Sequence, residues 1–118
     1  MYDVFLICPV RNATDEQKES LMEYIQSLES DGLSVYYPAR DTDQNDDGGF
    51  RICCDNRKAL RRSKKVYLFW DGKSDGSKFD LGMAWYGYKK LWVVNPETLD
   101  INKPGKSFDK MVYDWMEK

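Results

Sequence analysis

Four segments of the chain carry the apolar, β-branched and aromatic side chains that are typical of buried strands. Residues 3–9 (DVFLICP) form a continuous apolar run, which suits a central strand covered by helices on both faces. Residues 33–37 (LSVYY) end at Pro38, and residues 65–70 (KVYLFW) and 90–95 (KLWVVN) repeat the pattern. The sequence therefore predicts at least four strands.

Between these runs, apolar residues recur at helical spacing. Leu21, Ile25 and Leu28 predict a first helix that ends at the stop signal Asp31-Gly32 and has three candidates for its N-cap (Asn12, Thr14 and Asp15). The pattern predicts further helices within residues 50–63, 78–88 and 108–115. Residues 39–49 (ARDTDQNDDGG) are polar and rich in Gly and Asp, which predicts a loop long enough to cover a site.

Strands that alternate with helices predict an α/β fold of the flavodoxin or Rossmann type, a three-layer sandwich around a parallel sheet of four or five strands. The length of 118 residues fits one domain over residues 1–118. In such sheets a ligand binds beyond the carboxyl ends of the strands. The segments predicted to meet there are residues 8–12, the loop after the second strand, and residues 71–80.

Charge and composition exclude several classes of partner. Eighteen Lys and Arg against 20 Asp and Glu give a net charge of -2, which argues against a nucleic-acid or membrane-surface partner. The first residues lack a basic region, and the apolar runs are too short to span a bilayer. Three cysteines without a CxxC pair argue against disulfides and zinc. We expect a cytoplasmic protein.

The chain has no histidine, so the commonest general base and metal ligand is absent and carboxylates must carry any chemistry. Residues 43–48 resemble the start of a calcium-binding EF-hand loop, but Cys54 stands where that loop needs a bidentate Glu. We therefore expect neither a metal nor a cofactor. Cys8 and the Cys53-Cys54 pair are interpreted as small buried or half-buried residues.

Residues 71–77 (DGKSDGS) lead from the third strand into a helix. The free amides at the start of that helix and the hydroxyls of Ser74 and Ser77 are suited to an anion such as a phosphate. An ordinary strand-to-helix connector explains the same residues equally well.

Two carboxylates are candidates for catalysis. Asp80 is predicted just inside the helix after this loop, with Leu81 and Ala84 packed on the sheet and the carboxylate toward the ligand cleft. Asp55 is predicted within the preceding helix, where arginines make a surface ion pair the simpler interpretation. A helix N-terminal charge is likewise the simpler interpretation of Asp80. As a pair they fit glycosidic chemistry, which needs one group at the anomeric carbon and one at the leaving group.

Other residues are candidates for ligand binding. Arg11 follows the first strand, where a guanidinium can grip a phosphate or face solvent. Trp85, Tyr86 and Tyr88 offer rings that can stack on a base. The four tryptophans are nevertheless predicted at core-facing positions (Trp70, Trp85, Trp92 and Trp115).

From residue 4 to about residue 94, the chain resembles the nucleoside 2-deoxyribosyltransferases and the related 2'-deoxynucleoside 5'-phosphate N-hydrolases. The motifs are the turn Cys8-Pro9-Val10-Arg11-Asn12 after the first strand and residues 76–84 (GSKFDLGMA), in place of the family's G-x-x-E-L-G-x-A. Asp55 and Asp80 match the family's two acids, and Ser74 matches the serine that attends the 5'-phosphate. Asp80 replaces the family's nucleophilic Glu.

The resemblance implies cleavage or transfer at the N-glycosidic bond of a (deoxy)nucleoside or its 5'-monophosphate. Asp80 would attack or stabilise C1', and Asp55 would protonate or orient the departing base. The other implied substrate-binding residues are Cys8, Pro9, Arg11, Ser74, Gly76, Ser77, Phe79 and Met83, with residues 41–49 as a lid. It also implies a homodimer, for which the helix bearing Met83, Trp85 and Tyr86 is apolar enough.

Two alternatives stay open. In the first, the protein is a non-catalytic module that binds or senses a nucleotide or a nucleotide derivative in the same pocket, and Asp80 accepts hydrogen bonds from ribose hydroxyls. A phosphoacceptor receiver domain shares the architecture and has an acid like Asp71 after the third strand, but it also needs an acidic cluster where this chain has Arg11 and Asn12.

Overall fold

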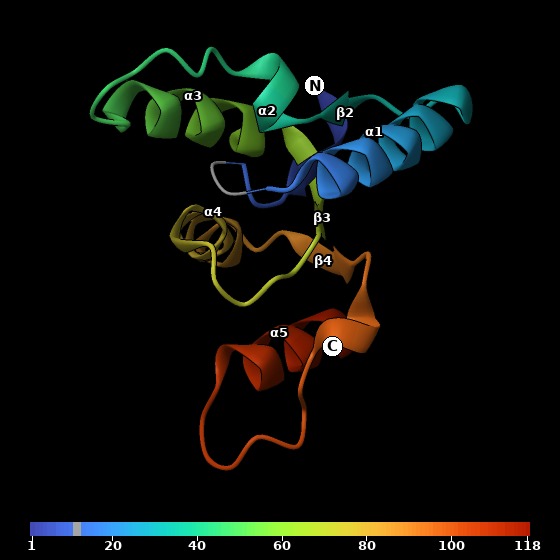
Figure 1. The fold of residues 1–118 in the computed structure, drawn as a ribbon, viewed down its shortest axis with the longest axis vertical. Helices are drawn as coiled ribbons and strands as arrows, with labels where there is room; N and C mark the ends of the chain where they lie inside the picture. Colours follow the sequence, from blue (N-terminus) through green and yellow to red (C-terminus); the bar gives the residue numbers. More distant parts are fainter. Residues whose placement is uncertain (11–12) are drawn as a thin grey trace.

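The computed structural model of the protein describes residues 1–10 and 13–118, and these form a parallel sheet with helices on both faces (Figure 1). The strands of the described chain are β1 (Tyr2–Ile7), β2 (Val35–Tyr36), β3 (Ser63–Leu68) and β4 (Lys90–Val93). Its helices are α1 (Asp15–Ser30), α2 (Pro38–Asp41), α3 (Phe50–Arg61), α4 (Asp75–Tyr86) and α5 (Phe108–Glu117), with a 3-10 turn η1 (Pro96–Thr98).

The strand order is β2-β1-β3-β4, and every neighbouring pair is parallel. Val4 lies opposite Val35 of β2, Phe5 opposite Val66 of β3, and Leu68 opposite Val93 of β4. This confirms the α/β fold of the flavodoxin type with helices on both sides. Because all strands run in one direction, the loops that follow them gather at one edge of the sheet, called the carboxyl edge below.

The first strand is central and buried on both faces, as its unbroken apolar run predicted. Val4 and Leu6 pack with Leu21 and Ile25 of α1, and Phe5 and Ile7 point to the opposite face. On that opposite face, Phe5 and Ile7 belong to a cluster with side chains of α3, α4 and α5 (Ala59, Leu60, Leu81, Ala84 and Val112). One long helix therefore covers one face, and three cover the other.

The N-cap of the first helix is Thr14, one of the three candidates that the sequence offered. Thr14 Oγ1 accepts a hydrogen bond from the N–H of Gln17 at 3.1 Å, and Gln17 Oε1 accepts one from the N–H of Thr14 at 2.9 Å. This capping box satisfies two amides that the helix leaves free.

The segment around β2 differs from the prediction. The strand has two residues instead of five, and Pro38 starts the short helix α2, so the expected loop begins only at Thr42. Proline suits the first turn of a helix because it has no N–H to leave unpaired. Arg40 of α2 holds the segment by bonding Asp41 at 2.8 Å and Glu29 of α1 at 3.1 Å.

Helix α4 begins three residues earlier than its apolar pattern indicated. Ser74 caps it by accepting the N–H of Ser77 at 3.1 Å, and Asp71 Oδ1 accepts the N–H of Ser74 at 3.0 Å. Gly76 and Ser77 therefore belong to its first turn.

The prediction that all four tryptophans face the core is wrong for two of them. Trp70 is buried, but the exposed fractions of Trp85 and Trp92 are 56% and 52%. The buried face of α4 contains Ser77, Leu81 and Ala84, and Trp85 lies at the border of this face, about 40° from Leu81 and about 100° from Ala84. Trp92 alternates with Leu91 and Val93 and so points to the opposite face of β4. Trp115 is half-buried.

No helix in the described part of the chain is long and apolar enough to cross a bilayer.

Candidate functional site

The carboxyl edge of the sheet brings Cys8 and Pro9, which follow β1, close to the amino end of α4. Cys8 and Pro9 are buried there, and the N–H of Phe69 bonds the carbonyl of Ile7 at 2.8 Å, which extends the pairing beyond β3. Arg11 follows β1 in the sequence and lies outside the described residues, so its role in binding stays a prediction.

Asp80 is the main titratable group at this edge. It is half-buried in the second turn of α4, one position before the buried Leu81. Burial raises its pKa from the ordinary 3.8 to about 7, because removing a carboxylate from water disfavours its charged form. At neutral pH the folded chain therefore holds Asp80 in both protonation states.

Two thiols lie close enough to Asp80 for its negative charge to raise their pKa. Burial, and then the negative charge of Asp80, raise the pKa of Cys8 to about 12. The same two causes raise the pKa of Cys53 on α3. Both thiols are thus held in the uncharged form, which supports their interpretation as small apolar neighbours of the carboxyl group. Cys53 was not among the predicted site residues, since only the packing of α3 on α4 brings it there.

The amino end of α4 has one polar atom without a use in folding. Ser77 is buried, with 3% of its surface exposed, and its Oγ finds no hydrogen-bond partner among the described residues. It is one turn before Asp80, so both lie toward the same side of the helix. Ser74 and Asp71 cap the loop before it, while Gly76 is exposed. A buried hydroxyl that lacks a partner costs free energy, so it marks a place where a ligand can bond.

Asp55 makes the surface ion pair that the sequence suggested. Its Oδ2 accepts a hydrogen bond from Arg51 Nη1 at 2.6 Å, one helical turn earlier on α3. Arg51 also donates to the carbonyl of Asp43 in the loop between α2 and α3. Burial is the cause of the raised pKa of Asp80, without a contribution from the charge of Asp55. Cooperation of the two carboxylates on one substrate stays a prediction.

Residues 42–49, within the expected lid, are anchored by internal hydrogen bonds. Tyr36 and Thr42 hydroxyls are 2.5 Å apart, and Thr42 Oγ1 donates to Asn56 Oδ1 at 2.8 Å, which connects β2, the loop and α3. Asp46 accepts the N–H of Ile52 at 3.1 Å, a bond that holds the pKa of Asp46 below its ordinary value. The sequence analysis did not predict this buried series of hydrogen bonds between Tyr36, Thr42 and Asn56, because the three residues are far apart in the sequence and belong to no motif.

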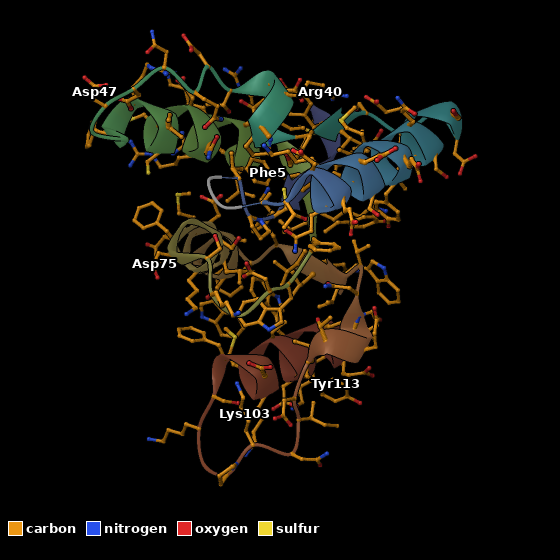
Figure 2. The ribbon with its side chains drawn as sticks, in the orientation of Figure 1. Phe5, Arg40, Asp47, Asp75, Lys103 and Tyr113 are labelled. Carbon is orange, nitrogen blue, oxygen red and sulfur yellow. The ribbon has the colours of Figure 1, made fainter. Side chains whose placement is uncertain are left out.

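The remaining predicted residues of α4 lie at different depths. Phe79 is 56% exposed, and Met83 is half-buried against the core that α3, α4 and α5 share. Figure 2 shows Asp75, at the start of α4, and Asp47 on the same side of the molecule. That side carries the loops of the carboxyl edge.

A groove of about 800 Å³ lies at the opposite edge of the sheet, where the strands begin. Its lining includes Trp85, Tyr86 and Tyr88, the rings considered for stacking on a base. Trp85 is five residues beyond Asp80, about 7.5 Å along the axis of α4. The structure places these rings in the groove, and their stacking on a base stays a prediction.

The chain matches no family model and no curated protein. Among solved structures, it is similar to the TIR domain of the Toll-related receptor TRR-2 from Hydra magnipapillata, with a TM-score of 0.61 and 14% identity. The match covers 79% of this chain and 69% of the TIR domain. At this identity the likeness shows the shared α/β fold and does not extend to function.

Proposed function

We propose that the chain cleaves or transfers the N-glycosidic bond of a small-molecule nucleoside, deoxynucleoside or 5'-monophosphate, using Asp80. The observation that carries the proposal is the position of this carboxyl group: half-buried at the carboxyl edge, beside Cys8 and one turn after the partnerless hydroxyl of Ser77. The resemblance to nucleoside 2-deoxyribosyltransferases places its nucleophilic acid at the same residue.

In this mechanism the ionised Asp80 faces the anomeric carbon. The bond from C1' to the base nitrogen breaks, the electron pair leaves with the base, and the base nitrogen takes up a proton from water. The carboxylate either bonds to C1' or stabilises its positive charge, and water or a second base then takes the sugar. Because burial raises the pKa of Asp80 to about 7, the ionised form is held in a poorly solvated place, where its charge acts more strongly on C1'.

Asp55 is proposed to orient the base. Its Oδ2 accepts a 2.6 Å hydrogen bond from Arg51, which fixes the carboxylate as an acceptor for an N–H of the base. Ser77 Oγ is proposed to bond a sugar hydroxyl or a phosphate oxygen, together with the first amides of α4.

The test is incubation of the purified chain with ribo- and deoxynucleosides and their 5'-monophosphates, followed by chromatography of the released base. We expect release that disappears in Asp80→Ala and persists in Asp75→Ala, which removes an exposed carboxylate from the same helix. Absence of base release from every compound contradicts the enzymatic proposal.

A second candidate is a module that binds a nucleotide without cleaving it, and the Asp80 side chain favours it. The resemblance has Glu at this place, and Asp is one methylene shorter. A displacement of about 1 Å from the reacting carbon costs about 100-fold in rate. The variant Asp80→Glu separates the two: an enzyme gains base release, whereas a binder shows a ligand-induced thermal shift but no release in either form.

A further inference from the structure

The two edges of the sheet differ in the charges that their segments carry. The edge where strands begin, called the amino edge here, has adjacent cations at the end of α3 and at the starts of β3 and β4 (Arg61, Arg62, Lys64, Lys65, Lys89 and Lys90). Its acids include Asp3, which is ion-paired with Lys64 at 3.3 Å, and Glu117. The carboxyl edge carries acids in the loops after β2 and β3 (Asp43, Asp46, Asp47, Asp71 and Asp75). Two copies that stack along the strand direction therefore bring opposite charges together.

The groove at the amino edge is aromatic as well as basic. It lies between the last turns of α4 and α5 and the start of β4, with a volume of about 800 Å³. Tyr86 and Tyr88 are 86% and 95% exposed, and Trp85 packs edge-on against Trp115, with ring centroids 5.3 Å apart. Contiguous exposed aromatic side chains mark an interaction surface more often than a free surface.

Two of the three groove lysines, Lys89 and Lys90, have no ion pair with an acid among the described residues, whereas Lys118 lies 4.0 Å from Asp114. Lys89 Nζ donates to the carbonyls of Ser63 and Arg61 at 2.5 and 3.3 Å, which are uncharged partners. Lys90 is exposed beside it, and within the groove lining Glu117 is the one acid against Lys89, Lys90 and Lys118. The groove is therefore suited to an acidic partner with an apolar tip.

The backbone of the groove is strained at Tyr88. This residue follows the end of α4 with φ +57, the left-handed conformation that glycine adopts most easily. Its neighbour Gly87 has φ -80, which any residue adopts. This conformation closes α4 as a Schellman-type cap: the N–H of Tyr88 bonds the carbonyl of Trp85 at 3.1 Å, and the N–H of Lys89 bonds that of Ala84 at 3.0 Å. A large, almost fully exposed ring thus occupies a helix-ending position where glycine is the commonest residue.

A complementary projection lies at the carboxyl edge. We call residues 47–50 the acidic knob: Asp47 and Phe50 are exposed, the latter by 81%, and Gly48 and Gly49 lie between them. The knob is ordered before it meets a partner, because Asp46 bonds the N–H of Ile52 and Arg51 bonds the carbonyl of Asp43. Ordering beforehand lowers the entropy cost of docking.

We propose that the acidic knob of one copy of this chain docks into the aromatic groove of a second copy. Phe50 packs among Tyr86 and Tyr88, and Asp47 faces Lys90. Knob and groove lie at opposite edges of the sheet, so each copy keeps one surface free and the contact is head-to-tail. Instead of the homodimer expected through Trp85 and Tyr86, such a contact adds one chain after another into longer assemblies. This inference does not depend on the proposed catalysis.

Sedimentation velocity over a concentration series tests the proposal. We expect the mean mass to rise beyond that of two chains at low salt and to fall toward one chain in about 1 M salt, where charges are screened beyond about 3 Å. Phe50→Ala and Tyr86→Ala each remove an exposed ring, so the fold remains, and each should weaken association at least tenfold. Phe108→Ala removes another exposed ring outside both surfaces and should change nothing.

Mixing the two variants is the decisive measurement. The Phe50→Ala chain keeps its groove and the Tyr86→Ala chain keeps its knob, so an equal mixture should form a pair of chains and stop there. Three results overturn the proposal: a single chain at all concentrations, association that survives Phe50→Ala, or a mixture that stays monomeric. Association that survives Phe50→Ala but is lost in Tyr86→Ala would indicate a closed pair built from two grooves.

Discussion

The two ends of helix α4 are built in opposite ways. At its amino end, polar groups are turned inward: Ser77 is buried with no hydrogen-bond partner in residues 1–10 and 13–118, and Asp80 is half-buried with a pKa of about 7. At its carboxyl end, Trp85 and Tyr86 are turned out to solvent. Stability alone favours the reverse at both ends. The difference is the observation behind our two proposals, a small ligand at the amino end of α4 and a second copy of the chain at its carboxyl end.

The largest effect we expect at the amino end is on the rate of base release. Because the mechanism needs ionised Asp80, and burial raises its pKa to about 7, the rate should rise with pH up to about 7 and then level off. Two pH units below the pKa, the rate should be about 100-fold lower. A rate that instead falls as pH rises through 7 would assign Asp80 the role of proton donor to the base.

The variant Asp80→Asn should stabilise the chain at alkaline pH. The folded chain keeps the proton of Asp80 up to about pH 7, whereas an unfolded chain loses it near pH 3.8. The unfolded state therefore binds fewer protons between these values, and Asp80 lowers stability increasingly as pH rises from about 4 to 7. We expect Asp80→Asn to raise the free energy of unfolding by about 2–4 kcal/mol at pH 8.

Below about pH 4 the same substitution should have little effect, since aspartate is then protonated in both states. Urea unfolding at the two pH values measures the difference. If the substitution changes the free energy of unfolding equally at both pH values, the carboxyl group of Asp80 is better solvated than its burial indicates. Asp75→Asn, on the exposed first turn of α4, is the matched control.

Two serines of the amino end should respond with opposite signs. Ser77→Ala removes a buried hydroxyl that lacks a partner and should stabilise the ligand-free chain by about 1 kcal/mol. Ser74→Ala removes the cap that accepts the N–H of Ser77 and should destabilise it by about 1 kcal/mol. Thermal unfolding of both variants, with and without inorganic phosphate, distinguishes a ligand-binding hydroxyl from a packing defect. If Ser77→Ala destabilises the chain, Ser77 Oγ has a role in folding.

The smallest effect belongs to the carboxyl end. Tyr88→Gly relieves a residue with φ +57 and should raise the free energy of unfolding by about 0.5–1 kcal/mol, after the extra chain entropy of glycine is subtracted. The variant should also weaken self-association. A loss of stability would show that the exposed ring contributes to the fold and would remove the contrast between the two ends.

The sequence predicted the framework of the fold better than its surface. The unbroken run at residues 3–9 identified the central strand, and the capping candidates near residue 14 included the N-cap of α1, because both patterns are local. The start of α4 was missed because Ser74, a capping residue, lies within a segment rich in Gly and Ser. Trp85 was assigned to the core by its chemistry, whereas its position on the helix turns it outward.

The candidate site was predictable in part. Asp80 was identified by motif and by position, and the structure adds the burial that shifts its pKa. Cys53 is near it only because α3 packs on α4, a contact between distant parts of the chain. The hydrogen-bonded series of Tyr36, Thr42 and Asn56 has the same origin.

Arg51 connects two parts of the molecule that would otherwise respond separately to a ligand. Its guanidinium bonds the carboxylate of Asp55 on α3 and the carbonyl of Asp43 in the neighbouring loop. A ligand that displaces the loop breaks the hydrogen bond from Arg51 to the carbonyl of Asp43. Arg51 then holds the carboxylate of Asp55 less firmly in place. Loop displacement and carboxylate orientation then form a single coupled equilibrium, so a substitution in the loop far from the substrate can alter affinity through Arg51.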